Sequence, residues 1–400
     1  MNIEKLSFEE DSVYMNLVIV SDDFPEKNHQ SYVFVEQLVI ALSDIHVKVS
    51  VIAPQSLTRR LFRGSANLPK DKQYFTAKGN SYEVYRPYYL SAGTVGPLQR
   101  FYFSSLRRSV ERVLRRIGHN NIDVVYGHFW HNANTLVNYS IKYNIPLFVA
   151  CGESGKAIQE LLTILNAEEK LRLANTVKGV ISVSTENKNR VLQTGLSVED
   201  KIEVIPNAVD KTVFSPRDRK GLRDKFGIKD TDFVICFVGG FINRKGSKRL
   251  SDAITQLNDP NIKSFFMGKA WSYDDCTPDC LGILLKDSIP HEDLPDYLSA
   301  SDVFVLPTLN EGCCNAIVEA LSCGLPVISS NLPFNDDILD ETCSVRIDPS
   351  NVVEIKNAIS LLKNDKPLRG KLAAGALKKS ESLSIDTRAK RVMKFIQSKM

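Results

Sequence analysis

The sequence lacks a long uninterrupted apolar run. Nowhere in its 400 residues does such a run approach the roughly 20 residues that a helix needs to cross a bilayer. Its acidic start, MNIEKLSFEEDS, also lacks the basic and then apolar pattern of a secretory signal. We therefore expect a cytoplasmic protein, with peripheral attachment to the inner face of a membrane as a further hypothesis.

The chain also has little net charge, and its cysteines have no framework spacing. A net charge of +4 is too weak to indicate a nucleic-acid partner, and the arginines lack the interleaved aromatics of a stacking groove. Eight cysteines, several of them inside apolar patterns, are typical of reduced and buried thiols. Cys276 and Cys280 in CTPDC have loose metal-ligand spacing and no second pair nearby, so we expect no metal site.

What the sequence does contain is an alternation of short apolar runs with helical stretches. One series begins near residue 15, and a second follows IEVIPNAVDKTVFSP. Such alternation predicts an α/β protein with parallel sheets, and the length favours two domains. We place one Rossmann-like domain at 1–205 and a second at 206–384, with a terminal helix at 385–400 that packs back on the first. The ligand is expected in the cleft between them, at the carboxyl ends of the strands.

The stretch LPTLNEGCCNAIVEALSCGLPVISS predicts a strand, an exit loop and a short helix with Asn315 as its N-cap. Free backbone N–H groups from Cys314 to Ile317 would form an anion or hydroxyl site, with Glu311 and Glu319 as acceptors beside it. Such a pocket suits a ligand with phosphate and vicinal hydroxyl groups, as in a nucleotide sugar. The alternative is that Glu319 is a first-turn acid favoured by the helix dipole and Glu311 a solvated loop residue.

The stretch FVICFVGGFINRKGSKRL predicts a buried strand followed by a cationic loop. Gly239 and Gly240 would allow a close approach of the backbone. Arg244 and Lys245 are then placed to neutralise a diphosphate, for which arginine offers bidentate geometry. The alternative is an exposed charged loop.

The first half offers fewer candidates. His128 follows the strand in IDVVYGHFWHN and could donate a hydrogen bond to a sugar or phosphate oxygen. His131 on the next helix is interpreted as structural, and Glu153 after another strand is open to either interpretation. Gln30 and Ser31 stand in the exit loop of the first strand, which has no glycine to cradle a phosphate.

Together these stretches resemble the retaining glycosyltransferases of family 4, which have the GT-B fold of two Rossmann-like domains facing each other across a cleft. EGCCNAIVEALSCGLPVI is similar to the E-x7-E signature of that family. GGFINRKG is similar to its diphosphate loop, and VIPNAVDKTVFSP to its interdomain motif. Gln30 and Ser31 depart from the Gly-Gly that the family often has there, Cys313 and Cys314 replace the common Phe-Gly, and Ala208 replaces Gly.

The resemblance implies that 1–205 is the acceptor-side domain and 206–384 the nucleotide-sugar-binding domain, and it implies roles for the candidate residues. Glu311 and His128 would be catalytic, with Glu311 near the anomeric centre and His128 close to the transferred sugar. The donor would be bound by Arg244 and Lys245 at its diphosphate, by Glu319 at its ribose, and also by Gly240 and Asn315. The donor is a UDP- or GDP-sugar, and the resemblance implies no cofactor and no metal.

The resulting prediction is a retaining transfer of a sugar to a glycan or lipid-linked acceptor, in the synthesis of a bacterial surface polysaccharide. One alternative is a catalytically silent partner subunit with the GT-B fold, which the missing first-loop glycines suggest. The other is a nucleotide-sugar epimerase of the same fold.

The segment 97–117 predicts a basic amphipathic helix. Its apolar stripe and its basic face are both clear, and Arg59, Arg60 and Arg63 could extend the basic face. Such a helix could dock on anionic lipid, and the alternative is a surface helix packed on the first domain with a solvated basic face. The stripe consists of Leu98, Phe101, Tyr102, Val110, Val113, Leu114 and Ile117, and the basic face of Arg100, Arg107, Arg108, Arg112, Arg115 and Arg116.

Overall fold

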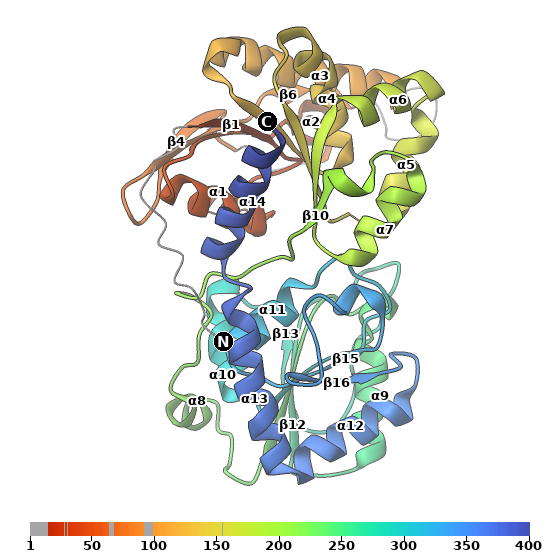
Figure 1. Ribbon diagram of the computed structural model, residues 1–400. Coiled ribbons are helices and arrows are strands. Elements are labelled where there is room, and N and C mark those ends of the chain that lie inside the picture. Colours follow the sequence, from red (N-terminus) through yellow and green to blue (C-terminus); the bar gives the residue numbers. More distant parts are fainter. Residues whose placement is uncertain (1–14, 28, 30, 64–67, 92–98, 154) are drawn as a thin grey trace, which may run out of the picture.

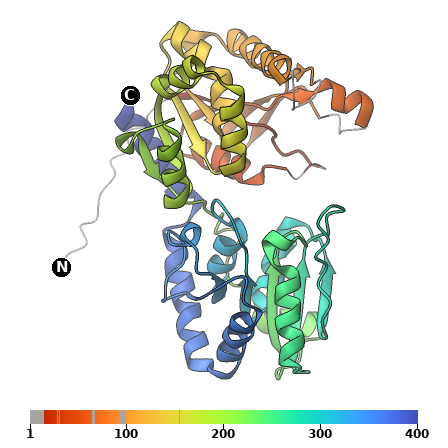
Figure 2. The same cartoon turned by 90° about the vertical axis from the view of Figure 1, so that its right-hand side faces the viewer.

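A computed structural model describes residues 15–27, 29, 31–63, 68–91, 99–153 and 155–400 of the chain. The described residues form two α/β lobes, one above the other in Figure 1 and seen from the side in Figure 2. Each lobe is built on its own mainly parallel sheet, so the predicted fold class, GT-B with two Rossmann-like domains, is confirmed. The residue boundaries proposed for the domains stay a prediction.

The first lobe contains an eight-stranded sheet in which all neighbours are parallel except β4 and β5. Its strands, in spatial order, are β10 (Ile202–Val204), β9 (Val177–Ser182), β8 (Leu147–Cys151), β7 (Val124–His128), β1 (Asn16–Val20), β2 (Lys48–Ile52), β5 (Ser81–Tyr85) and β4 (Asp71–Phe75). A small separate sheet pairs β3 (Gln55–Ser56) with β6 (Tyr88–Tyr89).

Helices cover both faces of this sheet because successive strand residues point to opposite sides. Leu17 and Ile19 of β1 join a core with α1 and α14, whereas Val18 and Val20 join a core with α3 and α4. The helices of this lobe are α1 (Val33–Asp44), α2 (Leu57–Arg63), α3 (Gln99–Ile117), α4 (Trp130–Tyr143), α5 (Gly155–Ile164), α6 (Ala167–Thr176), α7 (Thr185–Thr194) and α14 (Ile385–Lys399), with short η1 (His119–Asn121) and η2 (Glu199–Lys201).

The second lobe contains a six-stranded sheet that is parallel throughout. Its strands, in spatial order, are β13 (Ile283–Asp287), β12 (Ile262–Met267), β11 (Phe233–Val238), β14 (Val303–Leu306), β15 (Val327–Ser330) and β16 (Ser344–Ile347). Its helices are α8 (Arg219–Lys225), α9 (Ser247–Leu257), α10 (Leu294–Ala300), α11 (Asn315–Ser322), α12 (Val352–Asn364) and α13 (Lys366–Glu381), with short η3 (Asn243–Lys245), η4 (His291–Asp293) and η5 (Pro333–Asn335).

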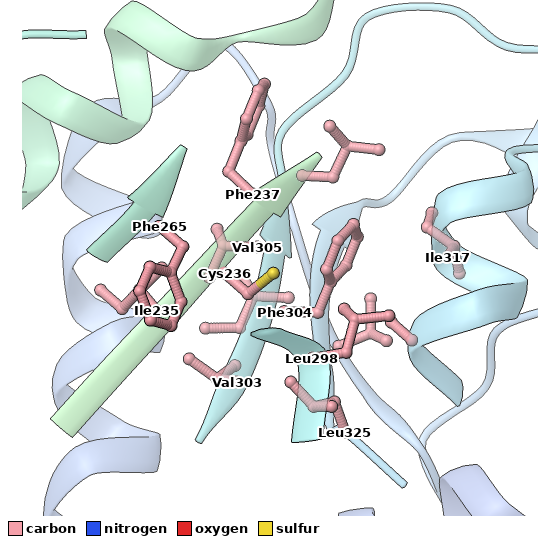
Figure 3. Packing of buried hydrophobic residues seen from close by; sticks show 14 of the residues in the cluster. Ile235, Cys236, Phe237, Phe265, Leu298, Val303, Phe304, Val305, Ile317 and Leu325 are labelled. Atoms are coloured by element: carbon pink, nitrogen blue, oxygen red, sulfur yellow. The ribbon is translucent and has the colours of Figure 1, made fainter. Parts of the chain in front are cut away.

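The core of the second lobe is one continuous cluster (Figure 3). Phe237 of β11, Phe304 of β14 and Ile317 of α11 are all fully buried in it. Burial of each such side chain stabilises the fold by about 1.5–3 kcal/mol. The loops that leave β11 and β14 therefore start from rigid strands in the centre of the sheet.

The two lobes meet at the carboxyl ends of their sheets. Gly312 follows β14 and lies so close to Gly152, which follows β8, that a Cβ atom on Gly312 would be 2.5 Å from the Gly152 carbonyl oxygen. Beside this contact, the backbone N–H and the hydroxyl of Thr185 each donate a 2.7 Å hydrogen bond to the Asp337 carboxylate. Loops at the strand ends of both lobes therefore face the same space.

Helix α14 returns from the second lobe to the first and lies against α1 and β9 (Figure 1). The ring of Phe395 lies so near Gly179 of β9 that a Cβ there would be 2.8 Å from it, so the glycine permits this packing. Arg388 donates to the backbone oxygens of Ile205 and Pro206 in the interlobe connection. The helix therefore braces the segment that joins the lobes.

The predicted basic helix is α3, although its buried face differs from the predicted stripe. Leu106, Ser109, Val110, Val113 and Leu114 are buried, but Phe101 is 45% exposed and the stripe is wrong at that position. Leu98 lies outside the described residues. The other described members of the stripe are buried or half-buried, and Tyr102 packs edge-on against Tyr89 of β6.

Candidate functional site

The cationic loop after β11 and the acidic loop after β14 meet at one carboxylate. Oε1 of Glu311 accepts hydrogen bonds from Arg244 Nη1 at 2.9 Å and from the Thr308 hydroxyl at 2.8 Å. Lys245 Nζ lies 2.7 Å from the same oxygen. Glu311 is therefore not the solvated loop residue of the alternative interpretation, and Oε1 brings the two cations together.

Lys245 is charged although it is buried. Burial alone would lower the pKa of its ammonium group, but the Cys314 thiol and the Glu311 carboxylate outweigh this effect and raise the pKa. The side chain of Lys245 is 15% exposed and that of Arg244 is 42% exposed. The loop therefore presents one enclosed cation and one accessible cation, with a single carboxylate between them.

Glu319 forms a second polar group on α11. Its Oε1 lies 2.8 Å from Nε2 of His291 in η4, and the residue is only 8% exposed. Burial lowers the pKa of His291, but the hydrogen bond and the charge of Glu319 more than offset this, so the pKa is raised. Glu319 is the fifth residue of α11, so it is not a first-turn acid. The sequence analysis did not predict its partner, His291.

Cys314 connects these two groups. Burial raises the pKa of its thiol to about 11, and Lys245, Glu311 and Glu319 all act on it electrostatically. The three charged residues therefore surround one neutral thiol at the beginning of α11. This convergence was expected from the positions of the loops, although the thiol between them was not.

The beginning of α11 differs from the prediction in one respect. Asn315 is the first residue of the helix and not its N-cap, which is Cys314 and makes no side-chain cap. The Asn315 side chain instead accepts a 2.8 Å hydrogen bond from Asn207 of the interlobe connection. The backbone N–H of Ile317 bonds to the Cys314 carbonyl, which removes it from the predicted set of free donors.

The glycines of the β11 loop allow close packing. Gly246 has φ +79°, and a Cβ atom on it would lie 2.4 Å from the Pro307 carbonyl oxygen. A Cβ on Gly240 would lie 3.4 Å from the Trp271 indole nitrogen. Gly246 therefore allows the cationic loop to pack closely against the end of β14. The donor-binding role of Gly240 stays a prediction.

His128 lies at the carboxyl end of β7, in the first lobe. Its ring is buried, and its Nδ1 has no hydrogen-bond partner among the described residues. Burial first, and then the positive charge of Arg388, lower its pKa to about 3, so the imidazole is neutral. No described contact joins it to Glu311 or Lys245, and its catalytic role stays a prediction.

A polar group that the sequence did not reveal lies beside the ends of β1 and β7. Asp22 accepts hydrogen bonds from His131, from Asn132 at 3.1 Å and from the Tyr32 hydroxyl at 3.0 Å. Burial would raise the pKa of Asp22, but His131 outweighs this and lowers it. Asp22 and His131 line a cavity of about 340 Å³, which we call the Asp22 pocket. Its lining includes Asp22, Tyr32, Arg59, Tyr89, Tyr102 and His131.

The other predicted candidates of this lobe have simpler places. Glu153 accepts hydrogen bonds from the backbone N–H of Trp130 at 2.8 Å and of Gly152 at 3.0 Å, so it caps the start of α4. Gln30 lies outside the described residues. Among the described residues, no group of three or more His, Cys, Asp or Glu side chains is placed to hold a metal ion.

Comparison with known families covers both lobes. Residues 33–213 match the family described as "Glycosyltransferase Family 4", and residues 218–379 match "Glycosyl transferases group 1". The chain belongs to glycosyltransferase family 4. As a member of this family, the protein is a glycosyltransferase with the GT-B fold, as its sequence motifs predict.

Two relatives illustrate the range of this family. A putative teichuronic acid biosynthesis glycosyltransferase, TuaC of Bacillus subtilis, is 24% identical over 340 residues, which cover 82% of this chain and 84% of TuaC. A UDP-Gal:alpha-D-GlcNAc-diphosphoundecaprenol alpha-1,3-galactosyltransferase of Escherichia coli is 34% identical over 180 residues, which cover 42% of this chain and 46% of that enzyme. The chain therefore spans about half the length of the second relative.

The fold is shared with a solved structure, Alr3699/HepE of Anabaena in complex with UDP-glucose. The two superpose with a TM-score of 0.71 at 16% identity, over 96% of this chain and 100% of HepE. None of the described helices of this glycosyltransferase combines the length and the apolar character that a bilayer crossing requires.

Proposed function

We propose that this glycosyltransferase moves a sugar from a UDP- or GDP-sugar, with retention of configuration, to a glycan or lipid-linked acceptor in bacterial surface polysaccharide synthesis. TuaC and the E. coli galactosyltransferase support the acceptor class, and HepE supports the donor class. The observation that carries the proposal is the convergence of Arg244 and Lys245 on Glu311 beside the beginning of α11.

The two cations bind the donor diphosphate. Two positive groups share one carboxylate, so the cluster keeps a net charge of +1 for an anionic ligand. The leaving group of the reaction is a nucleoside diphosphate, and fixed charges stabilise its developing charge without reorganisation. In this proposal the reaction needs no metal and no other cofactor, because Arg244 and Lys245 supply the positive charge.

Glu311 positions the cations and contacts the sugar. Its Oε1 is held by three donors, so it is a poor nucleophile, whereas Oε2 has no hydrogen bond to a described residue. This second oxygen accepts a hydrogen bond from a hydroxyl group of the transferred sugar. Glu319 binds the ribose hydroxyls, and the neutral imidazole of His128 approaches the sugar from the other lobe.

The acceptor enters through the Asp22 pocket. The pocket lies at the carboxyl ends of β1 and β7, where this lobe faces the donor loops. Its aromatic side chains, among them Tyr89 and Tyr102, offer flat faces to a sugar ring, and Asp22 accepts a hydrogen bond from a hydroxyl group. The ionised Asp22 is fixed by His131 and Asn132, so it orients the acceptor with little loss of entropy.

A panel of nucleotide sugars tests the proposal. A donor at 100 times its Kd should stabilise the folded protein by about 2.7 kcal/mol, which a thermal-shift assay detects. The selected donor is then incubated with acceptor, and the anomeric configuration of the product is measured by NMR. Isomerised sugar in the absence of acceptor would indicate an epimerase, and donor binding without any transfer would indicate a silent subunit.

We also propose that α2 and α3 contact an anionic membrane. In α2, Leu61 is 67% exposed and Phe62 is 83% exposed, beside the basic residues Arg59 and Arg60. Strand β6 lies next to α3 and pairs with β3, which leads directly into α2 (Figure 1). Arg100, Arg108, Arg112 and Arg115 of α3 are exposed and pair with no carboxylate among the described residues, whereas Arg116 pairs with Asp71 at 2.9 Å.

Vesicle sedimentation tests the membrane contact. The double variant Leu61→Ser/Phe62→Ser should bind vesicles of anionic phospholipid at least about tenfold more weakly than the wild type, because two apolar side chains no longer enter the lipid. Leu171→Ser/Val198→Ser is the matched control, since both side chains are more than half exposed elsewhere on the same lobe. Equal losses in the two variants would contradict the proposed surface.

A further inference from the structure

A wide groove lies on the second lobe at the edge opposite the donor loops. Its volume is about 810 Å³, and its lining includes Phe233 at the start of β11, Asp302 just before β14 and Pro326 just before β15. The donor loops leave the other ends of β11 and β14. At roughly 3.3 Å per residue, the six residues of β11 separate the two edges by about 20 Å. We call this feature the Asp302 groove.

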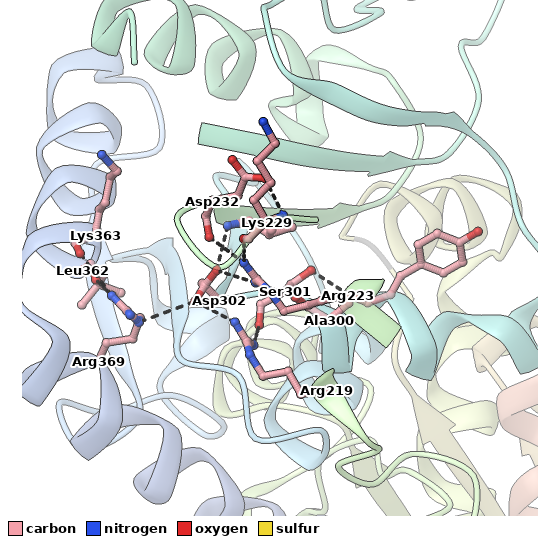
Figure 4. A network of polar contacts seen from close by, with 12 residues as sticks. Arg219, Arg223, Lys229, Asp232, Ala300, Ser301, Asp302, Leu362, Lys363 and Arg369 are labelled. Atoms are coloured by element: carbon pink, nitrogen blue, oxygen red, sulfur yellow. Dashed lines mark hydrogen bonds and ion pairs between the residues drawn. The ribbon is translucent and has the colours of Figure 1, made fainter. Parts of the chain in front are cut away.

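Three guanidinium groups surround the carboxylate of Asp302 in this groove (Figure 4). Arg219 lies 2.8 Å from it, Arg223 lies 3.3 Å from it and Arg369 lies 3.8 Å from it. Asp302 also accepts a 2.8 Å hydrogen bond from the backbone N–H of Val234. The single negative charge of Asp302 is therefore shared by three positively charged guanidinium groups.

Part of this network is structural. Arg223 donates to the backbone oxygens of Ala300, Lys229 and Asp232, and it is only 8% exposed. Its hydrogen bonds tie α8 to the beginnings of β11 and β14, so its charge serves the fold. The same explanation does not apply to the two lysines at the mouth of the groove.

Those lysines are Lys220 of α8 and Lys366 at the start of α13. Both line the groove and are exposed, and neither forms an ion pair with a described residue. Seven lysine and arginine side chains line the groove against four aspartates, and two of the seven, Arg217 and Lys363, pair with Asp296 and Asp259 outside the lining. Burial, Arg223 and Arg369 together outweigh Asp302 and lower the pKa of Arg219. Lys220 and Lys366 are the lining cations that no described carboxylate neutralises.

We propose that the Asp302 groove is a second anion site, which binds a soluble small molecule that carries a diphosphate or several phosphate groups. Arginine and lysine around a concave surface match phosphate oxygens in charge and in hydrogen-bond geometry. The volume lies within the range of small-molecule sites. Among the described residues that line the groove, no large hydrophobic side chain is exposed, as a membrane contact would require.

Isothermal titration of the full-length protein with inorganic pyrophosphate tests this site. The double variant Lys220→Gln/Lys366→Gln should bind pyrophosphate at the groove at least tenfold more weakly than the wild type, and it should fold normally because neither lysine forms an ion pair with a described residue. Lys371→Gln/Lys378→Gln is the matched control. It removes the same charge from exposed positions of α13 that do not line the groove, and it should bind as the wild type does.

The donor site also attracts a diphosphate, so a third variant separates the two sites. Lys245→Gln should leave binding at the groove intact, and the Lys220 and Lys366 substitutions should then remove it in that background as well. No binding by the wild type, wild-type affinity in the groove variant, or complete loss in Lys245→Gln alone would overturn the proposal. Unchanged titrations in Lys245→Gln would instead count against the donor site and not against the groove.

Discussion

Replacement of Lys245 by alanine is expected to lower kcat by about 10²- to 10³-fold, the usual cost of removing one fixed group that stabilises a developing negative charge. The side chain is enclosed, so no solvent cation takes its place with the same geometry. Glu311 would keep Arg244 as its partner, and the protein should therefore fold. Rates of sugar transfer at saturating donor measure the effect.

Lys248→Ala is the control for this experiment. Lys248 lies three residues further along the chain, in α9, where it is exposed and pairs with the half-buried Asp252 at 3.0 Å. Its removal takes away the same charge near the same loop and should leave kcat within about twofold, because exposed ion pairs contribute little. Equal loss of activity in both variants would show that general charge, and not the position of Lys245, supports transfer.

Glu319→Ala is expected to weaken donor binding by at least about 100-fold. Each hydrogen bond from a ribose hydroxyl to this buried carboxylate contributes about 1.5–3 kcal/mol to the free energy of donor binding, and the substitution removes two such bonds. The dissociation constant of the donor, measured by calorimetry, should therefore rise. Glu292→Ala is the control, because Glu292 is exposed in η4 beside His291 and makes no hydrogen bond to it. Unchanged donor affinity in Glu319→Ala would remove the ribose assignment.

The pH dependence of stability provides an independent readout for Glu319. The folded protein raises the pKa of His291 above its ordinary value of 6.5, so the protonated pair adds stability that is fully present below pH 6.5. This contribution is lost as the pH rises through the raised pKa. In Glu319→Ala the partner is gone, and burial, the largest effect, lowers the pKa of His291 against the smaller opposing effect of Glu292. Thermal denaturation should therefore show that this contribution is absent.

The sequence predicted the fold class well because apolar periodicity and turn residues are local signals. The same signals placed Arg244, Lys245 and Glu311 in loops directly after buried strands. The carboxyl ends of parallel strands lie at one edge of a sheet, so the convergence of these residues followed from topology. The helix boundary at Asn315 was wrong because its side chain bonds to Asn207, a partner 108 residues away.

What the sequence could not predict depends on tertiary contacts. His291 precedes Glu319 by 28 residues, and nothing in its local pattern indicates that η4 lies against α11. Asp22 and His131 are 109 residues apart, and His131 was interpreted as structural. The signal that could have found Asp22 is its position directly after the first buried strand, the same rule that selected the donor loops.

A crystal structure of the full chain with the nucleoside diphosphate that stabilises it most tests the donor site directly. The diphosphate should lie within hydrogen-bonding distance of Arg244 and Lys245, and the ribose hydroxyls should contact Glu319. A nucleotide bound elsewhere, with Lys245 and Glu319 both out of contact with it, would overturn the assignment of these residues to the donor.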